Sequence, residues 1–139
     1  MIARSLRRLR RDDRGQSLVE FALVAPILLI LILGIVDFAR AWNVYQVLTD
    51  AGREGARNAA VDNGASDAVI QNIVINAANR AGIQLGTSNV VVAQGTTSGD
   101  QATVTVSYTH RLNFIGGAFR IFTGSPDLPF TVVSTMRKE

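Results

Sequence analysis

The chain has 139 residues, with 14 basic and 11 acidic side chains, one histidine and no cysteine. This length suits one small domain, and the lack of cysteine excludes a disulfide framework, a thiolate metal site and a cysteine nucleophile. Six arginines and two aspartates lie within residues 1–15, so the rest of the chain is close to neutral. A nucleic-acid-binding domain spreads its basic residues over a folded face, so we expect no nucleic-acid partner.

An uncharged apolar run follows the basic tip. It covers residues 21–36 and ends at Asp37. A membrane-spanning helix needs about 20 apolar residues, and charged flanks that reach the headgroups supply the remaining length. We therefore predict a transmembrane helix over residues 16–41. A buried core helix is disfavoured, because the run is apolar on every face and the rest of the chain is too small to enclose it.

The charges around this run predict its orientation. Six arginines precede it, and only Arg40 follows closely. The positive-inside rule then places the N-terminus in the cytoplasm. Residues 42–139 are expected outside the inner membrane, as a helical stem and an outer head.

Three fates of the N-terminus are compatible with this pattern. A secretory signal would be cut after Ala41, but its apolar region is normally shorter, and Arg40 lies inside the small-residue site. An uncleaved anchor is the second possibility. The third is a basic leader, residues 1–15, removed on the cytoplasmic side between Gly15 and Gln16. The position of Gly15 favours this cut, because glycine leaves the backbone uncrowded for a protease.

The order of residues around Gly15 resembles the type IV prepilin signature. Cleavage there would make Glu20 the fifth and Phe21 the sixth residue of the mature chain, just before the apolar helix. The resemblance implies that Glu20 pairs with the new α-amino group, often on a neighbouring subunit. A carboxylate at the edge of hydrocarbon is costly unless it is paired. Alternatively, the Glu20 side chain simply reaches the headgroup region.

Aromatic residues mark the start of the stem. Phe38, Trp42 and Tyr45 have spacings of four and three, so they share one helix face. They either mark a membrane interface or make the first core contacts of the head.

Small residues form two adjacent rows further along the stem. Such rows allow another backbone to approach closely, and the partner is either the chain's own sheet or a neighbouring subunit. The residues that we assign to helix packing are Gly52, Gly55, Ala56 and Ala59. On the polar side we expect Glu54 to pair with Arg57 at i,i+3 spacing.

Residues 14–61, which include RGQSLVEFALVAPILLILILGIVDFARAW and the REGAR box, resemble the TadE-like proteins of tight-adherence pili. The ending TVVSTMR at 131–137, followed by Glu139, also resembles that family, whereas residues 62–128 are not diagnostic. The resemblance implies processing by a prepilin peptidase and insertion into the inner membrane. It further implies a role in initiating or decorating a fibre made of another pilin.

The head is predicted to be α+β, as in type IV pilins. Residues 62–67 form a turn too loose for a calcium loop. An amphipathic helix then runs from Ser66 to a stop at Gly82. Three strands of an antiparallel sheet are expected at 89–94, 102–112 and 130–136. The apolar segment 112–122 forms either a short helix or a loop, and we favour its burial over an exposed subunit contact.

The chain carries no pattern that supports catalysis. His110 is expected at the surface, and no nucleophile–base pair or metal-binding motif is present in the sequence. Asp37, Asp50 and Glu54 on the stem are interpreted as surface charge. We therefore expect no enzyme, no cofactor, no metal and no small-molecule substrate.

The favoured function is a minor pilin or pseudopilin that takes part in assembly of a tight-adherence (type IVc) pilus. Its partners would be membrane lipid, the prepilin peptidase, other pilins and the pilus assembly platform. The alternative is an uncleaved, membrane-anchored binding module, with 95–101 and 113–122 as its contact regions. A secreted enzyme released after Ala41 has no catalytic residues to support it.

Overall fold

A computed structural model describes residues 13–62 and 64–138 of the chain. Most of the predicted leader and Glu139 therefore lie outside the described residues. Contacts divide the chain into two compact units, with the boundary between Val36 and Asp37. We call the second one, from Asp37 onwards, the head unit.

A long helix, α2, runs from Asp13 to Val61 and contains Pro26. It is the one helix among the described residues that is long and apolar enough to cross a membrane. Its most apolar window has a mean hydropathy of 2.8 and contains no buried residue. Length and composition therefore fit the predicted single-pass helix.

The head unit contains a second helix, α3, at Asp67–Arg80. Ser66 occupies the N-cap position as predicted, although its side chain makes no capping hydrogen bond. The helix ends at Arg80, and Gly82, two residues later, has a φ of 82° that suits glycine. The N–H groups of Gly82 and Ile83 donate to the carbonyls of Asn79 and Ala78, which is the Schellman pattern for closing a helix.

A three-stranded antiparallel sheet of order β1-β2-β3 completes the predicted α+β fold. Its strands are β1 at Val90–Ala93, β2 at Gln101–Arg111 and β3 at Asp127–Arg137, with a short 3-10 turn, η2, at Thr87–Asn89 before the first. The third strand begins three residues earlier than predicted and includes Pro129. Because β3 is an edge strand, the missing N–H of Pro129 is tolerated there.

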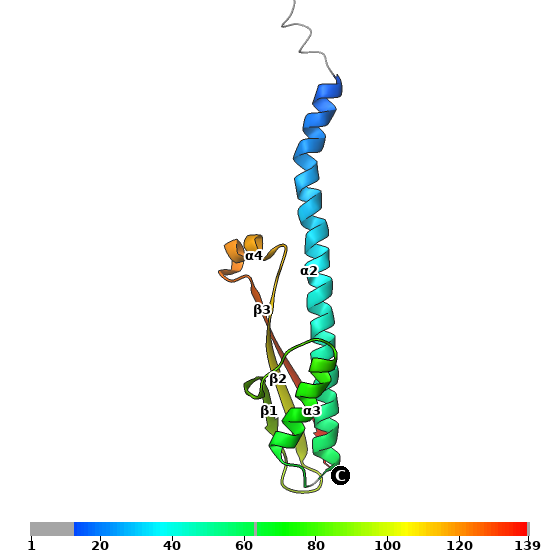
Figure 1. Cartoon of the computed structure of the whole chain (residues 1–139), viewed down its shortest axis with the longest axis vertical. Coiled ribbons are helices and arrows are strands. Elements are labelled where there is room, and N and C mark those ends of the chain that lie inside the picture. The colour runs from blue at the N-terminus through cyan, green and yellow to red at the C-terminus, as the bar shows by residue number, and fades with distance from the viewer. Residues whose placement is uncertain (1–12, 63, 139) are drawn as a thin grey trace, which may run out of the picture. The chain divides into compact units, whose positions relative to one another are not determined.

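The core of the head unit lies between the sheet and two helices (Figure 1). Strand β2 alternates as predicted and directs every second side chain inward. The inward side chains meet α3 and the part of α2 after Asp37. The largest fully buried apolar side chains are Leu48, Ile70, Val74, Val90, Val104 and Val106.

The segment between β2 and β3 is more exposed than we predicted. It contains a short helix, α4, at Gly116–Thr123, which was one of the two predicted conformations. Burial of the segment, which we favoured, is wrong: Ile121 and Phe122 are 82% and 87% exposed. Within α4, Gly116 is the buried residue, so the segment contributes little to the core.

Candidate functional site

The predicted processing and assembly residues lie in the first turns of α2. Gly15, Gln16, Glu20 and Phe21 are all exposed. The side-chain amide of Gln16 donates to a carboxylate oxygen of Glu20, with 3.1 Å between Nε2 and Oε1. Residues four apart are neighbours on a helix surface, so Gln16 and Glu20 are brought together by the helix itself. Their roles in cleavage and in amine pairing stay predictions.

The apolar run after Phe21 presents large side chains to the outside on every face. The exposed ones include Leu23, Ile27, Leu28, Leu29, Ile30, Leu31, Ile32 and Ile35. A contiguous apolar surface of this kind is rare on monomeric soluble proteins and marks a membrane or protein contact. The exposed run is therefore the main interaction surface of the first unit.

Asp37 is buried, contrary to the prediction from the sequence. It was interpreted as surface charge, but its exposure is only 1%. Its Oδ2 atom accepts hydrogen bonds from the backbone N–H of Phe114, at 2.8 Å, and of Ile115, at 2.9 Å. Its Oδ1 atom accepts a third from the N–H of Asn113, at 3.3 Å. We call this arrangement the Asp37 clamp.

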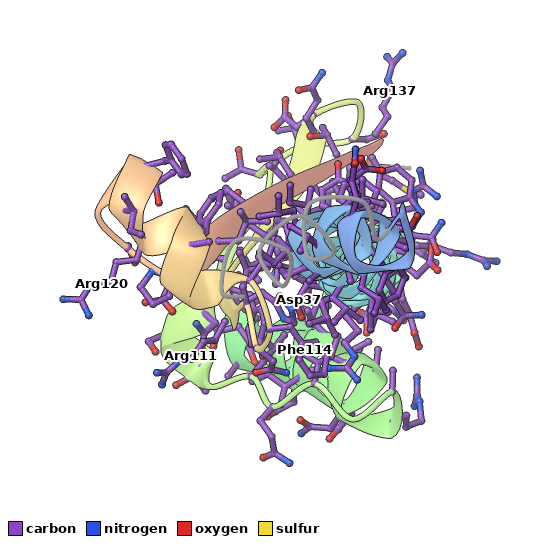
Figure 2. The ribbon with its side chains drawn as sticks, turned by 90° about the horizontal axis from the view of Figure 1, so that it is seen from above. Asp37, Arg111, Phe114, Arg120 and Arg137 are labelled. Carbon is purple, nitrogen blue, oxygen red and sulfur yellow. The ribbon has the colours of Figure 1, made fainter. Side chains whose placement is uncertain are left out.

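The clamp sits immediately before the first turn of α4. Backbone N–H groups at a helix N-terminus lack partners within the helix and favour a negative charge. Asp37 supplies that charge from a different helix, as the labelled side chains show (Figure 2). Nearby, the guanidinium carbon of Arg40 lies 5.1 Å from the centre of the Phe114 ring, a cation–π arrangement that holds the same loop.

The small residues of the stem are packed inside the head unit. A Cβ added to Gly52 would lie 2.9 Å from Oγ of Ser134 on β3. A Cβ added to Gly55 would overlap Cγ2 of Val74 on α3. Ala56 and Ala59 are fully buried. Of the two partners left open by the sequence, these contacts are with the chain's own sheet and α3, while contact with other pilins stays a prediction.

The charged side of the stem forms a different ion pair from the predicted one. Glu54 faces Arg80 of α3, with 3.3 Å between the carboxylate and the guanidinium nitrogen. The expected partner, Arg57, is one turn away on the same helix, but packing of α3 beside α2 brings Arg80 closer. Both members of the pair are largely exposed, so the pair contributes little to stability.

The stem aromatics form a row of ring contacts that reaches β3 of the head, while a role at a membrane interface stays a prediction. Phe38 stacks on Trp42, and Trp42 lies against Tyr45. Tyr45 in turn meets Phe130 of β3 edge-on, with 5.9 Å between ring centres. Tyr45 therefore contacts the head, whereas Phe38 and Trp42 remain mainly exposed. The apolar hollow beside them has a volume of about 210 Å³.

His110 is half-buried rather than fully at the surface, because its ring stacks on Phe130 with 6.4 Å between centres. Within residues 13–62 and 64–138, no group of three His, Asp or Glu side chains is placed to hold a metal ion.

The family model described as TadE-like protein matches residues 15–57. The chain carries a TadE-like segment. The match begins at Gly15 and includes the apolar run, Asp37, Gly52, Gly55 and Ala56, so it confirms the resemblance of that part of the chain. The resemblance of residues 131–137 stays a prediction. No curated protein and no solved structure gives a match to the chain.

Proposed function

We propose that this protein is a minor pilin or pseudopilin of a tight-adherence pilus. In this proposal a prepilin peptidase removes residues 1–15 by cutting between Gly15 and Gln16. Residues 16–41 insert into the inner membrane with the N-terminus in the cytoplasm. The remaining stem and head lie outside, and the subunit joins other pilins on the assembly platform.

One observation carries this proposal. The TadE-like segment coincides with a helix that places Gly15 and Glu20 directly before an exposed apolar run. A soluble protein would bury such a run, and a plain anchor has no need of a glycine and a glutamate in that register. Membrane lipid before assembly, and other pilin helices after it, provide apolar surroundings for the same residues.

Glu20 has a defined task in this proposal. Cleavage would create an α-amino group on Gln16, one helical turn before Glu20. The Gln16 side chain already lies within hydrogen-bond distance of the Glu20 carboxylate, so an ammonium group at the same residue would be close to that charge. Pairing within the subunit or with a neighbour offsets both charges at the membrane surface.

The small-residue rows support a division of labour along α2. Because Gly52 and Gly55 face Ser134 and Val74 of the same chain, the stem helps to build the head. Contacts between subunits then fall mainly to the exposed run before Asp37. Under this division, the sequence of the head can change without altering the contacts that the apolar run makes with other subunits.

The mass of the protein recovered from the membranes of its own cells tests the proposal. A chain that begins at Gln16 supports prepilin processing. A chain that begins at Met1 contradicts it and favours a membrane-anchored binding module, and one that begins at Trp42 indicates a secreted head. Gly15→Val should block the cut, whereas Gly34→Val, a matched change in the same helix, should leave it intact.

A further inference from the structure

Helix α4 exposes two large apolar side chains next to each other. Ile121 and Phe122 are the most exposed large hydrophobic residues that the structure describes. Burial of large apolar side chains away from water is favourable, so leaving both in water is costly. We propose that α4 lies on the outer surface of the membrane, with Ile121 and Phe122 inserted at the boundary between headgroups and acyl chains.

The Asp37 clamp fixes where α4 begins. Asp37 directly follows the last residue of the uncharged run, and its carboxylate holds the N–H groups of residues 113–115. Covalent continuity therefore keeps the start of α4 close to the point where the apolar run ends. If that run spans the bilayer, as the proposed function requires, this point is the outer interface.

The side chains near the clamp have the composition of an interfacial surface. Phe38, Trp42 and Phe114 are exposed aromatic residues on or beside it. Aromatic side chains, Trp and Tyr above all, concentrate at membrane–water interfaces. Their rings are apolar, and the polar groups of Trp and Tyr can stay in contact with water. The same end of the head unit thus supplies both aromatic anchors and the apolar tip of α4.

Positive charge accompanies this apolar surface. Arg111 and Arg120 line an open hollow of about 460 Å³ next to Gly116 and Gly117. Their side chains extend outward from the molecule, and Arg120 projects from α4 itself (Figure 2). Arginine pairs well with phosphate, and basic residues close to an anionic membrane are attracted to its surface. An anionic phospholipid surface therefore complements α4 better than a neutral protein surface.

A cysteine-based fluorescence experiment on the full chain tests this proposal. The chain has no cysteine, so Ala118→Cys introduces a single labelling site on the exposed side of α4 and keeps both Ile121 and Phe122. Val91→Cys provides the aqueous reference, because Val91 pairs with Thr105, roughly 20 Å along β2 from Arg111 at about 3.3 Å per residue. Leu29→Cys reports on insertion of the apolar run.

Each labelled chain is reconstituted into vesicles of phosphatidylethanolamine and phosphatidylglycerol. Brominated lipid is the quencher in one arm, and iodide on both sides of the bilayer is the quencher in the other. We expect lipid quenching at positions 29 and 118, and iodide quenching at position 91. Iodide quenching at 118 should be several-fold weaker than at 91.

Substitution of Ile121 and Phe122 tests whether these two side chains hold α4 at the membrane. Ile121→Ser with Phe122→Ser, in the Ala118→Cys chain, should raise iodide quenching at 118 to the level at 91. Val133→Ser is the matched control, because Val133 is also an exposed apolar residue but lies on β3. Val133→Ser should change neither lipid quenching nor iodide quenching of the label at position 118. The unfolding midpoint of each variant verifies that the head remains folded.

Three results overturn the proposal. Iodide quenching at 118 equal to that at 91, with lipid quenching at 29, would show an inserted helix whose α4 stays in water. Protection of 118 from iodide without quenching by lipid bromine would identify a protein contact, such as a second copy of the chain. Absence of lipid quenching at 29 would remove the membrane insertion on which the proposal depends.

Discussion

Asp37 and Phe114 are 77 positions apart in the chain, yet the Asp37 carboxylate accepts the Phe114 N–H at 2.8 Å. The contact joins the stem helix to the loop that opens α4. It also explains why an acidic side chain directly after an apolar run is buried rather than exposed. A buried carboxylate is tolerated when several N–H groups surround it.

Loss of this carboxylate is expected to destabilise the loop. Asp37→Ala would leave the N–H groups of residues 113–115 without their acceptor, which costs on the order of 2–4 kcal/mol. Amide hydrogen exchange at these three positions in detergent micelles measures the effect. We expect exchange there to accelerate strongly, while β2 exchanges as before.

Asp37→Asn is the control for shape. The amide keeps one acceptor oxygen in nearly the same volume but loses the negative charge. Protection at residues 113–115 should therefore fall between that of the wild type and Asp37→Ala. Equal protection in all three proteins would contradict the clamp.

A methyl group at Gly55 is expected to destabilise the head. The new Cβ would overlap Val74, whose branched side chain has little freedom to turn aside. Overpacking costs about 1–3 kcal/mol, which exceeds the gain of about 1 kcal/mol from replacing glycine with alanine in a helix. The denaturant midpoint of Gly55→Ala should fall.

Gly52→Ala provides the matched comparison one turn earlier. Its Cβ would meet the end of the Ser134 side chain at 2.9 Å, and that side chain can rotate, so the net change should be below about 1 kcal/mol. In addition, Val74→Ala should cost less in the Gly55→Ala protein than in the wild type. Additive effects in that double-mutant cycle would show that the two sites do not interact.

Replacement of Glu20 should separate processing from assembly. Glu20→Val removes the carboxylate proposed to pair with the new α-amino group, but leaves Gly15 and the basic leader unchanged. The mature mass should still appear, whereas the amount of protein incorporated into pili should fall. Normal incorporation would count against the proposed pairing. Glu54→Val, a change of the same kind on the exposed stem, controls for loss of charge alone.

The loop between β1 and β2 is expected to make the stability of the protein depend on pH. Oδ2 of Asp100 accepts hydrogen bonds from the Thr97 hydroxyl and from the N–H groups of Thr97 and Thr96, at 2.8–3.0 Å. The Thr97 hydroxyl and N–H, then the Thr96 N–H and the charge of Lys138, outweigh the opposing effect of burial. They hold the pKa of Asp100 below its ordinary value of 3.8.

A lowered folded-state pKa stabilises the protein while the carboxylate is charged. The contribution is fully present above the unfolded pKa and is lost as the pH falls through the folded pKa. Wild type should therefore be more stable than Asp100→Asn near neutral pH. The difference should shrink below pH 3.8, as denaturant midpoints measured across that range will show. A constant difference would exclude the charge of Asp100 as its cause.

Local sequence patterns were sufficient to predict most of the fold. The charge-free run, the period of α3 with its stop at Gly82 and the alternation in β2 are all properties of neighbouring residues. They correctly gave the helices, the three strands and the antiparallel pairing through the 95–101 loop. The ends of the strands were less accurate, because pairing with a neighbouring strand decides where a strand stops.

The Asp37 clamp could not be predicted in the same way, because its donors are backbone N–H groups that any residue carries. One signal was available. Asp37 lies four residues before Ala41, in register with the buried stripe that continues through Leu48. The partner of Glu54 was missed for a related reason, since Arg80 is 26 positions away and approaches only when α3 packs on α2.

The order of elements in the head has a consequence for its synthesis. At about 5–20 residues per second, the 77 positions between Asp37 and Phe114 take roughly 4–15 s to translate. Strand β3, which pairs along the whole of β2, follows later still. The stem therefore emerges with its small-residue rows and its carboxylate uncovered. A chaperone acting during this interval would meet an apolar helix face that the finished head no longer presents.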